Sequence, residues 1–304
     1  FKQKTAYEIR LSLVGSEMCI RDRPAIELLR SDPSRVEPGF VLFPVEIGRS
    51  HVVAVDKDGR VVGTWQGTGP TTRSLEFSDG AFTALMGDAV YRWAPTGEGL
   101  ASWTSSRGLV PGAIVLPIRE FHHEVAFEPD GSFWTLSKEL VPVPDYPATV
   151  QRPSVTAPAT IDADLVVHWS ADGTLLHEWS LAERLDPNRI GFGSMDSNAN
   201  GAFDWSHGNA IVPLPNEGAV LVSVRHQDAI VKLSLPDGEI EWILGNPDGW
   251  SPEHRALLLR PAGGFPWQYH QHAPTVGPDG RILMFDNGND GRTTPYTRDP
   301  DPAG

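Results

Sequence analysis

Residues 51–65 read HVVAVDKDGRVVGTW: an apolar segment, an Asp-Gly pair, and a second apolar segment that ends in tryptophan. Asp and Gly tolerate the positive φ angles of tight hairpin turns, so an Asp-Gly pair between alternating apolar residues predicts two antiparallel strands. Nearly the same pattern returns at 165–179 as LVVHWSADGTLLHEW and at 229–245 as AIVKLSLPDGEIEWILG. Variants of it occur at 124–137 and 274–288, and residues 81–105 look like another hairpin with a different turn. The chain is therefore predicted to consist of repeated β-hairpins.

The units recur irregularly, at intervals of roughly 40–65 residues, and each contains several strands. This arrangement is typical of propeller blades. A β-sandwich is the main alternative, but it does not require a recurrent hairpin that closes on tryptophan. We therefore expect an all-β fold, a β-propeller that starts near Pro38 and is incomplete at its C-terminus. Long insertions are expected at 138–160, 186–205 and 246–268. Helical signals are confined to Ala182–Leu185 and Pro252–Leu259.

The net charge of the 304-residue chain is −14 at pH 7, from 25 basic and 39 acidic residues. A chain with this balance repels nucleic acid and anionic membrane surfaces, so we expect neither as a partner. The sequence has no run of 18 apolar residues, and we expect no membrane-spanning helix.

Residues 1–23 differ in composition from the rest of the chain and contain its only cysteine, Cys19. They resemble translated adapter sequence of the kind found at the ends of metagenome-derived reading frames. We therefore expect residues 1–23 to be non-native and residues 24–304 to form the propeller domain. That domain has no cysteine, which excludes disulfides, thiolate chemistry and cysteine-ligated zinc within it.

Most histidines precede apolar strands that lead into the repeat. They lie in REFHHEVAF (His122, His123), DWSHGN (His207), SVRHQD (His226, beside Arg225) and WQYHQHAP (His270, His272). In a propeller the innermost strands of all blades converge on the axis, so these side chains are expected to meet at one polar site. His207 and Asn209 are two residues apart, and on an extended chain both point to the same face.

Four motifs follow one another along the chain: DWSHGNAI, SVRHQDAIVKL, YHQHAP and ILMFDNGN. In this order they resemble the successive motifs of the bacterial arylsulfotransferase (aryl-sulfate sulfotransferase) family. PGFVLFP and AVDKDGRVVGTW resemble its first strands, and the likeness extends from about Gly39 to Arg292. The resemblance implies a six-bladed propeller that moves a sulfuryl group from an aryl sulfate ester to a phenol. It implies a ping-pong mechanism through a sulfohistidine, without a nucleotide donor.

Small aryl sulfates and phenols are thus the implied partners, with no cofactor and no metal. The resemblance also implies a periplasmic or secreted location and leaves a homodimer open. It assigns catalytic roles to His272 as the covalent nucleophile and to His207, Arg225 and His123. Contacts with substrate are expected from Asn209, His122, His226 and Trp205. His122 competes with His123, and His270 with His272, for the matched positions.

The chemistry of sulfuryl transfer explains these residue types. Like phosphoryl transfer, it passes through a loose transition state with charge on the peripheral oxygens, so positioning and electrostatics dominate. The planar fork of Arg225 suits pairs of oxygen atoms. A neutral imidazole such as His272 can attack sulfur near neutral pH. His207 can protonate the leaving phenolate and later deprotonate the acceptor, with Asn209 binding a sulfate oxygen.

Two other classes of function stay open. Four histidines that converge on a propeller axis can bind iron, as in propeller-type dioxygenases, although Arg225 and Asn209 argue against a metal. A non-catalytic propeller that only binds an anion is the other alternative. Residues 196–201, DSNANG, resemble the start of a calcium loop, but His207 stands where the bidentate glutamate is needed, so we expect no EF-hand.

Overall fold

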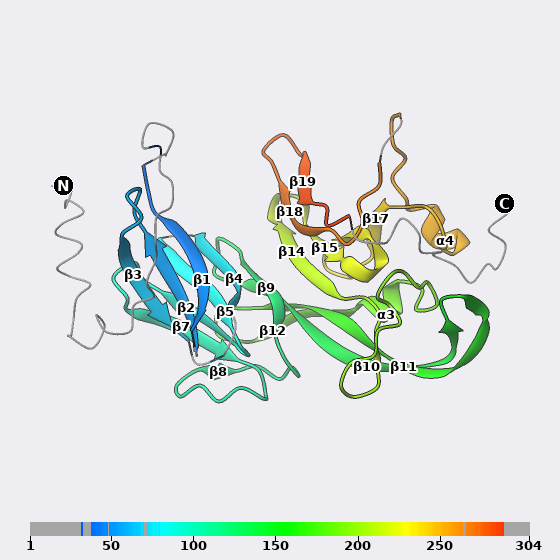
Figure 1. The fold of residues 1–304 in the computed structure, drawn as a ribbon, viewed down its shortest axis with the longest axis horizontal. Coiled ribbons are helices and arrows are strands. Elements are labelled where there is room, and N and C mark those ends of the chain that lie inside the picture. Colours follow the sequence, from blue (N-terminus) through cyan, green and yellow to red (C-terminus); the bar gives the residue numbers. More distant parts are fainter. Residues whose placement is uncertain are drawn as a thin grey trace. The chain divides into compact units, whose positions relative to one another are not determined.

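The computed structural model describes residues 32, 38–47, 49–67, 69, 72–78, 80–263 and 266–288. Their regular structure is almost entirely β-strand (Figure 1), which confirms the predicted all-β class. The chain divides into two compact units, residues 1–117 and residues 118–304. The predictions for residues 1–23 lie outside the described residues. In the described part of the chain, no helix has the length and apolar character needed to cross a bilayer.

The first unit contains two sheets, both with neighbouring strands in sequence order. The three-stranded sheet consists of β1 (Val41–Ile47), β2 (Arg49–Val55) and β3 (Val61–Gln66). The second sheet consists of β4 (Thr72–Ser78), β5 (Ala81–Met86), β6 (Ala89–Trp93), β7 (Gly99–Thr104) and the short β8 (Ile114–Val115). All pairs are antiparallel except β7 with β8.

The second unit contains the remaining strands. One sheet is formed by β9 (His122–Phe127), β10 (Phe133–Thr149), β11 (Arg152–Trp169) and β12 (Leu175–Ser180), with β13 (Phe203–Asp204) parallel to β11. A four-stranded antiparallel meander is formed by β14 (Gly208–Leu214), β15 (Ala219–Val224), β16 (Ala229–Ser234) and β17 (Ile240–Gly245). The last pair is β18 (His272–Val276) and β19 (Ile282–Phe285). Short helical turns are α3 (Leu181–Arg184), η1 (Pro215–Glu217), η2 (Arg225–Gln227) and α4 (Pro252–Arg255).

All of the predicted hairpins are present, and the Asp-Gly turns explain why. At the β2–β3 turn the Asp56 carboxylate accepts backbone N–H bonds from Asp58 and Arg60, both at 2.9 Å, while Gly59 has φ of +74°. This is the local geometry that Asp and Gly provide and most other residues resist. The two predicted helical turns are confirmed as α3 and α4.

Residues 138–160 form no separate insertion. They extend the β10–β11 hairpin with a largely continuous ladder of paired residues, from Lys138 opposite Asp164 to Val143 opposite Ala159. Val143 and Tyr146 pack in the main core, and the Tyr146 hydroxyl donates to the backbone oxygen of Ser194 at 2.7 Å. A closed ring of blades is not among the described features, so the propeller stays a prediction.

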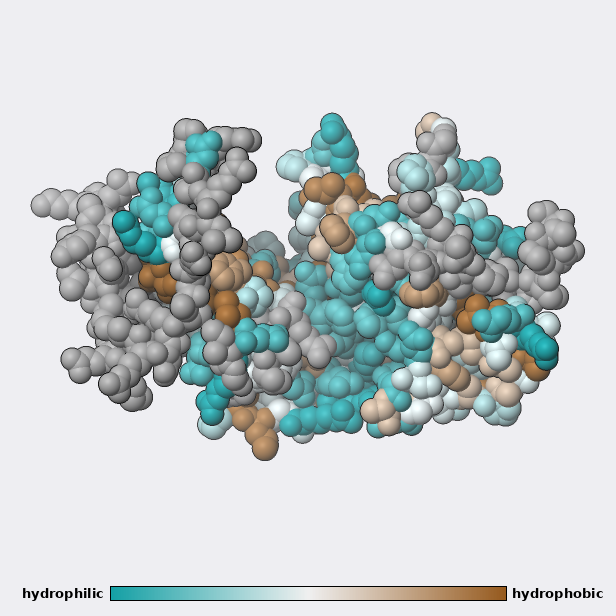
Figure 2. Space-filling model, viewed as in Figure 1, coloured by the Kyte–Doolittle hydropathy of each residue, from teal (hydrophilic) through white to brown (hydrophobic). Residues whose placement is uncertain are grey.

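The β18–β19 pair has half the strands of the β14–β17 sheet and exposes apolar side chains. Leu283 and Phe285 of β19 are 75% and 66% exposed, and Figure 2 shows a hydrophobic patch where this hairpin lies. An apolar strand with an unpaired edge is a surface that further strands normally cover. This sheet is therefore incomplete within the described residues.

Arg189 ties together the loops around the core of the second unit. Its side chain is almost fully buried and donates to the backbone oxygen of Gln227 at 2.8 Å, to the Gln227 amide oxygen at 3.0 Å and to the backbone oxygen of Asp248 at 3.1 Å. The guanidinium also lies 4.0 Å from the centre of the Trp250 ring. A buried charge needs such compensation, and here acceptors and an aromatic face provide it.

We expect Arg189→Met to destabilise the second unit, because the side chain keeps its length while two buried oxygens of Gln227 and the backbone oxygen of Asp248 lose their donor. An acceptor left unsatisfied in the interior costs about 1–3 kcal/mol, so the free energy of unfolding should fall by at least ~2 kcal/mol. Urea unfolding of the variant and of Arg152→Met, whose arginine is exposed at the start of β11, measures the difference. Equal losses in the two variants would contradict the role of Arg189.

Candidate active site

Imidazole rings from four separate segments form a row in the second unit. The His122 and His123 rings meet edge to face with centroids 5.2 Å apart, and the centroids of His123 and His207 are 4.9 Å apart. His207 and His226 follow at 4.5 Å, and His226 and His270 at 5.8 Å. The structure thus brings together histidines that the sequence places on β9, before β14, on η2 and before β18.

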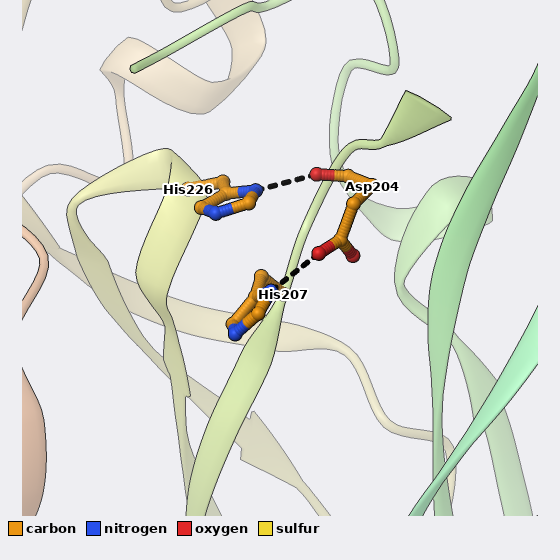
Figure 3. Close-up of side chains that lie close together, drawn as sticks. All are labelled: Asp204, His207 and His226. Carbon is orange, nitrogen blue, oxygen red and sulfur yellow. Dashed lines mark hydrogen bonds and ion pairs between the residues drawn. The ribbon is translucent and has the colours of Figure 1, made fainter. Parts of the chain in front are cut away.

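Asp204, at the end of β13, joins two of these rings. His207 Nδ1 donates to the carboxylate oxygen Oδ2 of Asp204 at 2.5 Å, and His226 Nδ1 donates to the Asp204 backbone oxygen at 2.5 Å (Figure 3). On the other side of the His226 ring, Arg225 Nη1 donates to Nε2 at 2.6 Å. Burial, with the nearby His207, lowers the pKa of His226 to about 3. The His226 ring is therefore neutral, with its proton on Nδ1.

Lys138 is the cation that accompanies Asp204. Its ammonium group lies 3.0 Å from the other carboxylate oxygen of Asp204 and 3.6 Å from Asp162 Oδ2. Burial alone would raise the pKa of Asp204, but the hydrogen bond and charge of His207 and the Lys138 ammonium hold it well below its usual range. Burial opposes the charge of Lys138 as well, yet Asp164 and Asp204 raise its pKa overall. The pair is therefore ionised.

A second carboxylate, Asp164 of β11, holds the first histidine of the row. His122 Nε2 lies 3.0 Å from Asp164 Oδ1 and 3.1 Å from the Ser137 backbone oxygen, and its Nδ1 lies 3.0 Å from His123 Nδ1. Burial opposes ionisation of Asp164, but its hydrogen bond to His122 and the charges of His122 and Lys138 keep its pKa well below the usual range. His122 is buried, whereas His123 is half-buried. The geometry favours His123 as the ring that faces the site.

His272 and His270 differ in what their ring nitrogens contact. His272 Nδ1 lies 3.0 Å from the His270 backbone oxygen and 3.1 Å from Asn287 Oδ1, so Nδ1 carries the proton and Nε2 the lone pair. Burial lowers the pKa of His272, which favours the neutral ring. His270 is fully buried and its Nε2 donates to the Phe192 backbone oxygen at 2.9 Å. Of the two candidates, His272 offers the nucleophilic nitrogen.

Two expected substrate contacts have mainly structural positions. The Asn209 side chain is buried and donates from Nδ2 to the Gln271 backbone oxygen at 2.8 Å, which joins the start of β14 to the segment before β18. Trp205 is fully buried in the main core, and its indole N–H donates to the Arg189 backbone oxygen at 2.9 Å. This corrects the expectation that Trp205 binds substrate, because its ring has no accessible surface.

Three histidines of the row have a left-handed backbone. The φ angles of His123, His207 and His270 are +56°, +49° and +53°. Residues with a Cβ adopt this region at a cost of about 1–2 kcal/mol each. Strain of this kind is retained where the surrounding structure enforces it, most often at functional sites.

The residues of the site do not fit a metal ion. Asp204, His207 and His226 do offer ligand atoms within 4.8 Å of one another. However, Asp204 already accepts from the Lys138 ammonium, and both nitrogens of His226 are engaged, one of them by the Arg225 guanidinium. A metal would have to displace two cationic side chains, whereas an anion beside Arg225 would find a complementary charge.

Comparison with known proteins identifies the family. Residues 26–301 match the family model described as arylsulfotransferase (ASST). The chain belongs to the arylsulfotransferase family.

Curated relatives of this arylsulfotransferase-family chain are longer than the chain itself. Arylsulfate sulfotransferase AssT of Lelliottia amnigena is 25% identical over 175 residues, which cover 42% of this chain and 29% of that protein. AssT of Escherichia coli O6:H1 strain CFT073 is 24% identical over 259 residues, which cover 70% of this chain and 40% of that protein. The chain thus spans less than half the length of either relative.

A solved structure with a partial likeness is a protein of unknown function from Bacteroides caccae. It has a TM-score of 0.41 and 14% identity, and the match covers 69% of this chain and 58% of that chain. A TM-score of this size does not establish a shared fold.

The sequence alone does not predict a role for Asp164, for Lys138 or for the pairing of Asp204 with His207. A signal for the carboxylates was present: in IDADLVVHW, Asp162 and Asp164 alternate on one face of an otherwise apolar strand. Asp204 likewise precedes His207 by three residues in DWSHGN. A charged residue in an apolar strand implies a partner, but the sequence does not name it.

We expect the neutral His226 ring to make stability fall in mild acid. Its pKa is 6.5 when unfolded and about 3 when folded, so below pH 6.5 the unfolded chain takes up a proton that the folded chain does not. Above pH 6.5 the group contributes no pH dependence; at pH 5 the loss is about 2 kcal/mol.

The variant His226→Asn keeps a donor for the Asp204 backbone oxygen but cannot titrate. Between pH 7 and pH 5 it should lose about 2 kcal/mol less stability than the wild type. Urea unfolding at the two pH values measures both slopes. The interpretation fails if the slopes are the same.

Proposed function

We propose that this chain carries an aryl-sulfate sulfotransferase site, which moves a sulfuryl group from an aryl sulfate ester to a phenol through a covalent intermediate on His272 Nε2. The observation that supports this most is the state of the His272 ring: two oxygen acceptors hold its proton on Nδ1, and the lone pair is on Nε2. The Arg225 charge and the His207 ring also act on the pKa of His272, which puts all three in one electrostatic environment.

In the first half-reaction, the Nε2 lone pair of His272 forms an N–S bond to the donor while the bond from sulfur to the aryl oxygen breaks. The electrons of that bond leave with the aryl oxygen, which takes a proton from Nε2 of His207. The oxygens of His270 and Asn287 stabilise the positive charge that develops on the His272 ring, because they already accept its Nδ1–H.

In the second half-reaction, the phenolic acceptor gives its proton to Nε2 of His207. The acceptor oxygen forms a bond to sulfur as the N–S bond breaks, and the electron pair returns to His272 Nε2. The same imidazole thus acts first as acid and then as base, and Asp204 is the counter-ion of its protonated form. This sequence is a ping-pong mechanism with a sulfohistidine.

Arg225 is proposed to bind the oxygens of the sulfuryl group. It is half-buried, burial lowers its pKa, and one of its Nη atoms is directed to His226. A partly desolvated guanidinium attracts an oxyanion more strongly than one in bulk water. The His226 ring, neutral and fixed in its tautomer, keeps the fork in place.

We further propose that the sheets of this chain are blades of a six-bladed propeller. The antiparallel meander β14–β17 supports this, as does the half-complete β18–β19 sheet with its uncovered apolar residues. A periplasmic or secreted location, a homodimer and a propeller domain over residues 24–304 stay predictions.

The purified protein mixed with 4-nitrophenyl sulfate should release nitrophenolate steadily only when phenol is added. With the donor alone, intact-mass analysis should show one added sulfuryl group. His272→Ala should abolish both signals, because the proposed intermediate forms on His272 Nε2. His51→Ala, in the first unit, should change neither. A folded wild-type protein without adduct or turnover would refute the proposed activity.

Arg225→Lys should lower kcat/KM for 4-nitrophenyl sulfate by roughly 10²-fold, since the charge stays while the fork that meets two oxygens is lost. Steady-state kinetics with saturating phenol measures the change. Arg255→Lys, on the exposed face of α4, is the matched control and should retain wild-type kinetics. An unchanged kcat/KM in Arg225→Lys would remove Arg225 from the mechanism.

A further inference from the structure

We propose that Asp204 is a positioning residue, which keeps the proton of the neutral His207 ring on Nδ1 so that Nε2 serves the reacting oxygen, and that Lys138 fixes the orientation of Asp204. This inference rests on the proposed role of His207 as acid and base. Asp204 itself does not touch the reacting atoms.

The contact with Asp204 decides the tautomer of His207. An ionised carboxylate only accepts hydrogen bonds, so His207 Nδ1, 2.5 Å from Asp204 Oδ2, must be the donor. In the neutral ring the lone pair is then on Nε2. The side chain of His207 is 24% exposed, so this nitrogen belongs to a ring that a substrate can reach.

The two oxygens of Asp204 have different partners. Oδ2 accepts from His207, while Oδ1 accepts from the Lys138 ammonium at 3.0 Å. Lys138 is held in turn by Asp162, whose Oδ2 accepts from Asn198 Nδ2 at 2.8 Å and whose Oδ1 lies 3.3 Å from Arg119 Nη1. Rotation of the Asp204 carboxylate would break this chain, so its orientation is fixed.

The second carboxylate–histidine contact in the site shows what distinguishes Asp204. Asp164 faces His122, but that ring is only 4% exposed and its Nε2 also lies 3.1 Å from a backbone oxygen. The Asp164 contact therefore serves packing. The Asp204 contact instead orients a ring with accessible surface, which is what an acid–base group requires.

The variant Asp204→Asn tests positioning because it keeps the shape of the side chain while it changes the hydrogen-bonding character and removes the charge. One carboxylate oxygen becomes an NH₂ group, which donates. The amide oxygen should face Lys138, because an NH₂ group beside an ammonium would set donor against donor. The NH₂ group then faces His207, whose Nδ1 must accept and whose proton moves to Nε2. In that tautomer Nε2 cannot take a proton from the acceptor phenol.

Nitrogen-15 NMR of the histidine rings reads the tautomer without any need for activity. At a pH where the ring is neutral, we expect His207 of the wild type to carry its proton on Nδ1 and that of Asp204→Asn to carry it on Nε2. The signals are assigned by their loss in His207→Ala. A wild-type proton on Nε2 would overturn the proposal, and this measurement stands even if the variant does not fold.

Kinetics of the donor half-reaction provide a readout that a packing defect would not give. Unsubstituted phenolate is a strong base and needs a proton to leave, whereas 4-nitrophenolate leaves without one. His207 donates this proton from its doubly protonated form, whose counter-ion is Asp204. Asp204→Asn removes that counter-ion and should therefore slow sulfation of His272 by phenyl sulfate roughly 10²-fold and by 4-nitrophenyl sulfate far less. Equal slowing with both donors, or no slowing, would overturn the positioning role.

Two further variants complete the test. Asp237→Asn removes an exposed carboxylate after β16 and should leave both rates unchanged. In a His207→Ala background, Asp204→Asn should add little, because Asp204 acts through His207. If the wild type forms no sulfohistidine with either donor, the proposed function fails while the NMR result still decides the pairing. If the wild type is active and Asp204→Asn retains the wild-type tautomer, only the positioning role fails.

Discussion

The site is organised around carboxylates that water does not reach. Asp164 is 1% exposed, and an ionised group at that depth is stable only when its oxygens have partners. Its Oδ2 accepts from the Ser206 hydroxyl and the Gly208 backbone N–H, both at 2.5 Å, and His122 lies on its other oxygen. A Cβ at position 208 would approach the Asp164 carboxyl carbon to 3.0 Å, so glycine there allows the close contact without a shift of the carboxylate. Asp164 thus holds the backbone at the start of β14, between His207 and Asn209.

The net charge of the chain does not decide which charges meet at the site. A protein of net charge −14 repels anions at a distance, but Arg225 and Lys138 place two positive charges among the carboxylates of the site. Lys138 is matched by Asp204 and Asp162, so its charge serves internal structure. Arg225 has a neutral ring as a hydrogen-bond partner, while the charges of Asp204, Asp228 and Asp196 also act on its guanidinium. Because Lys138 is paired internally while Arg225 is hydrogen-bonded to a neutral ring, an anion site at Arg225 is consistent with the acidic net charge of the chain.

The sequence predicts structure that depends on residues adjacent in the chain. It does not predict contacts between residues that are far apart in the chain. The Asp56–Gly59 turn forms from its own residues, so its hairpin was predictable. Lys138 and Asp204 are 66 residues apart, and no spacing rule connects them. His272 could be selected by motif, yet its advantage over His270 depends on which oxygens surround each ring. Trp205 was misassigned because burial of an aromatic ring depends on the packing of the loops above it.

The left-handed backbone at His123, His207 and His270 has an evolutionary consequence. Glycine occupies this conformation without a steric penalty, so the residue that would relax each position is one that cannot act on a substrate. Selection for folding alone would therefore favour glycine at positions 123 and 207, whereas the buried His270 ring also bonds to the Phe192 backbone oxygen and packs in the interior. Among homologous sequences, glycine at positions 123 and 207 would mark lineages that kept the scaffold after the activity was lost.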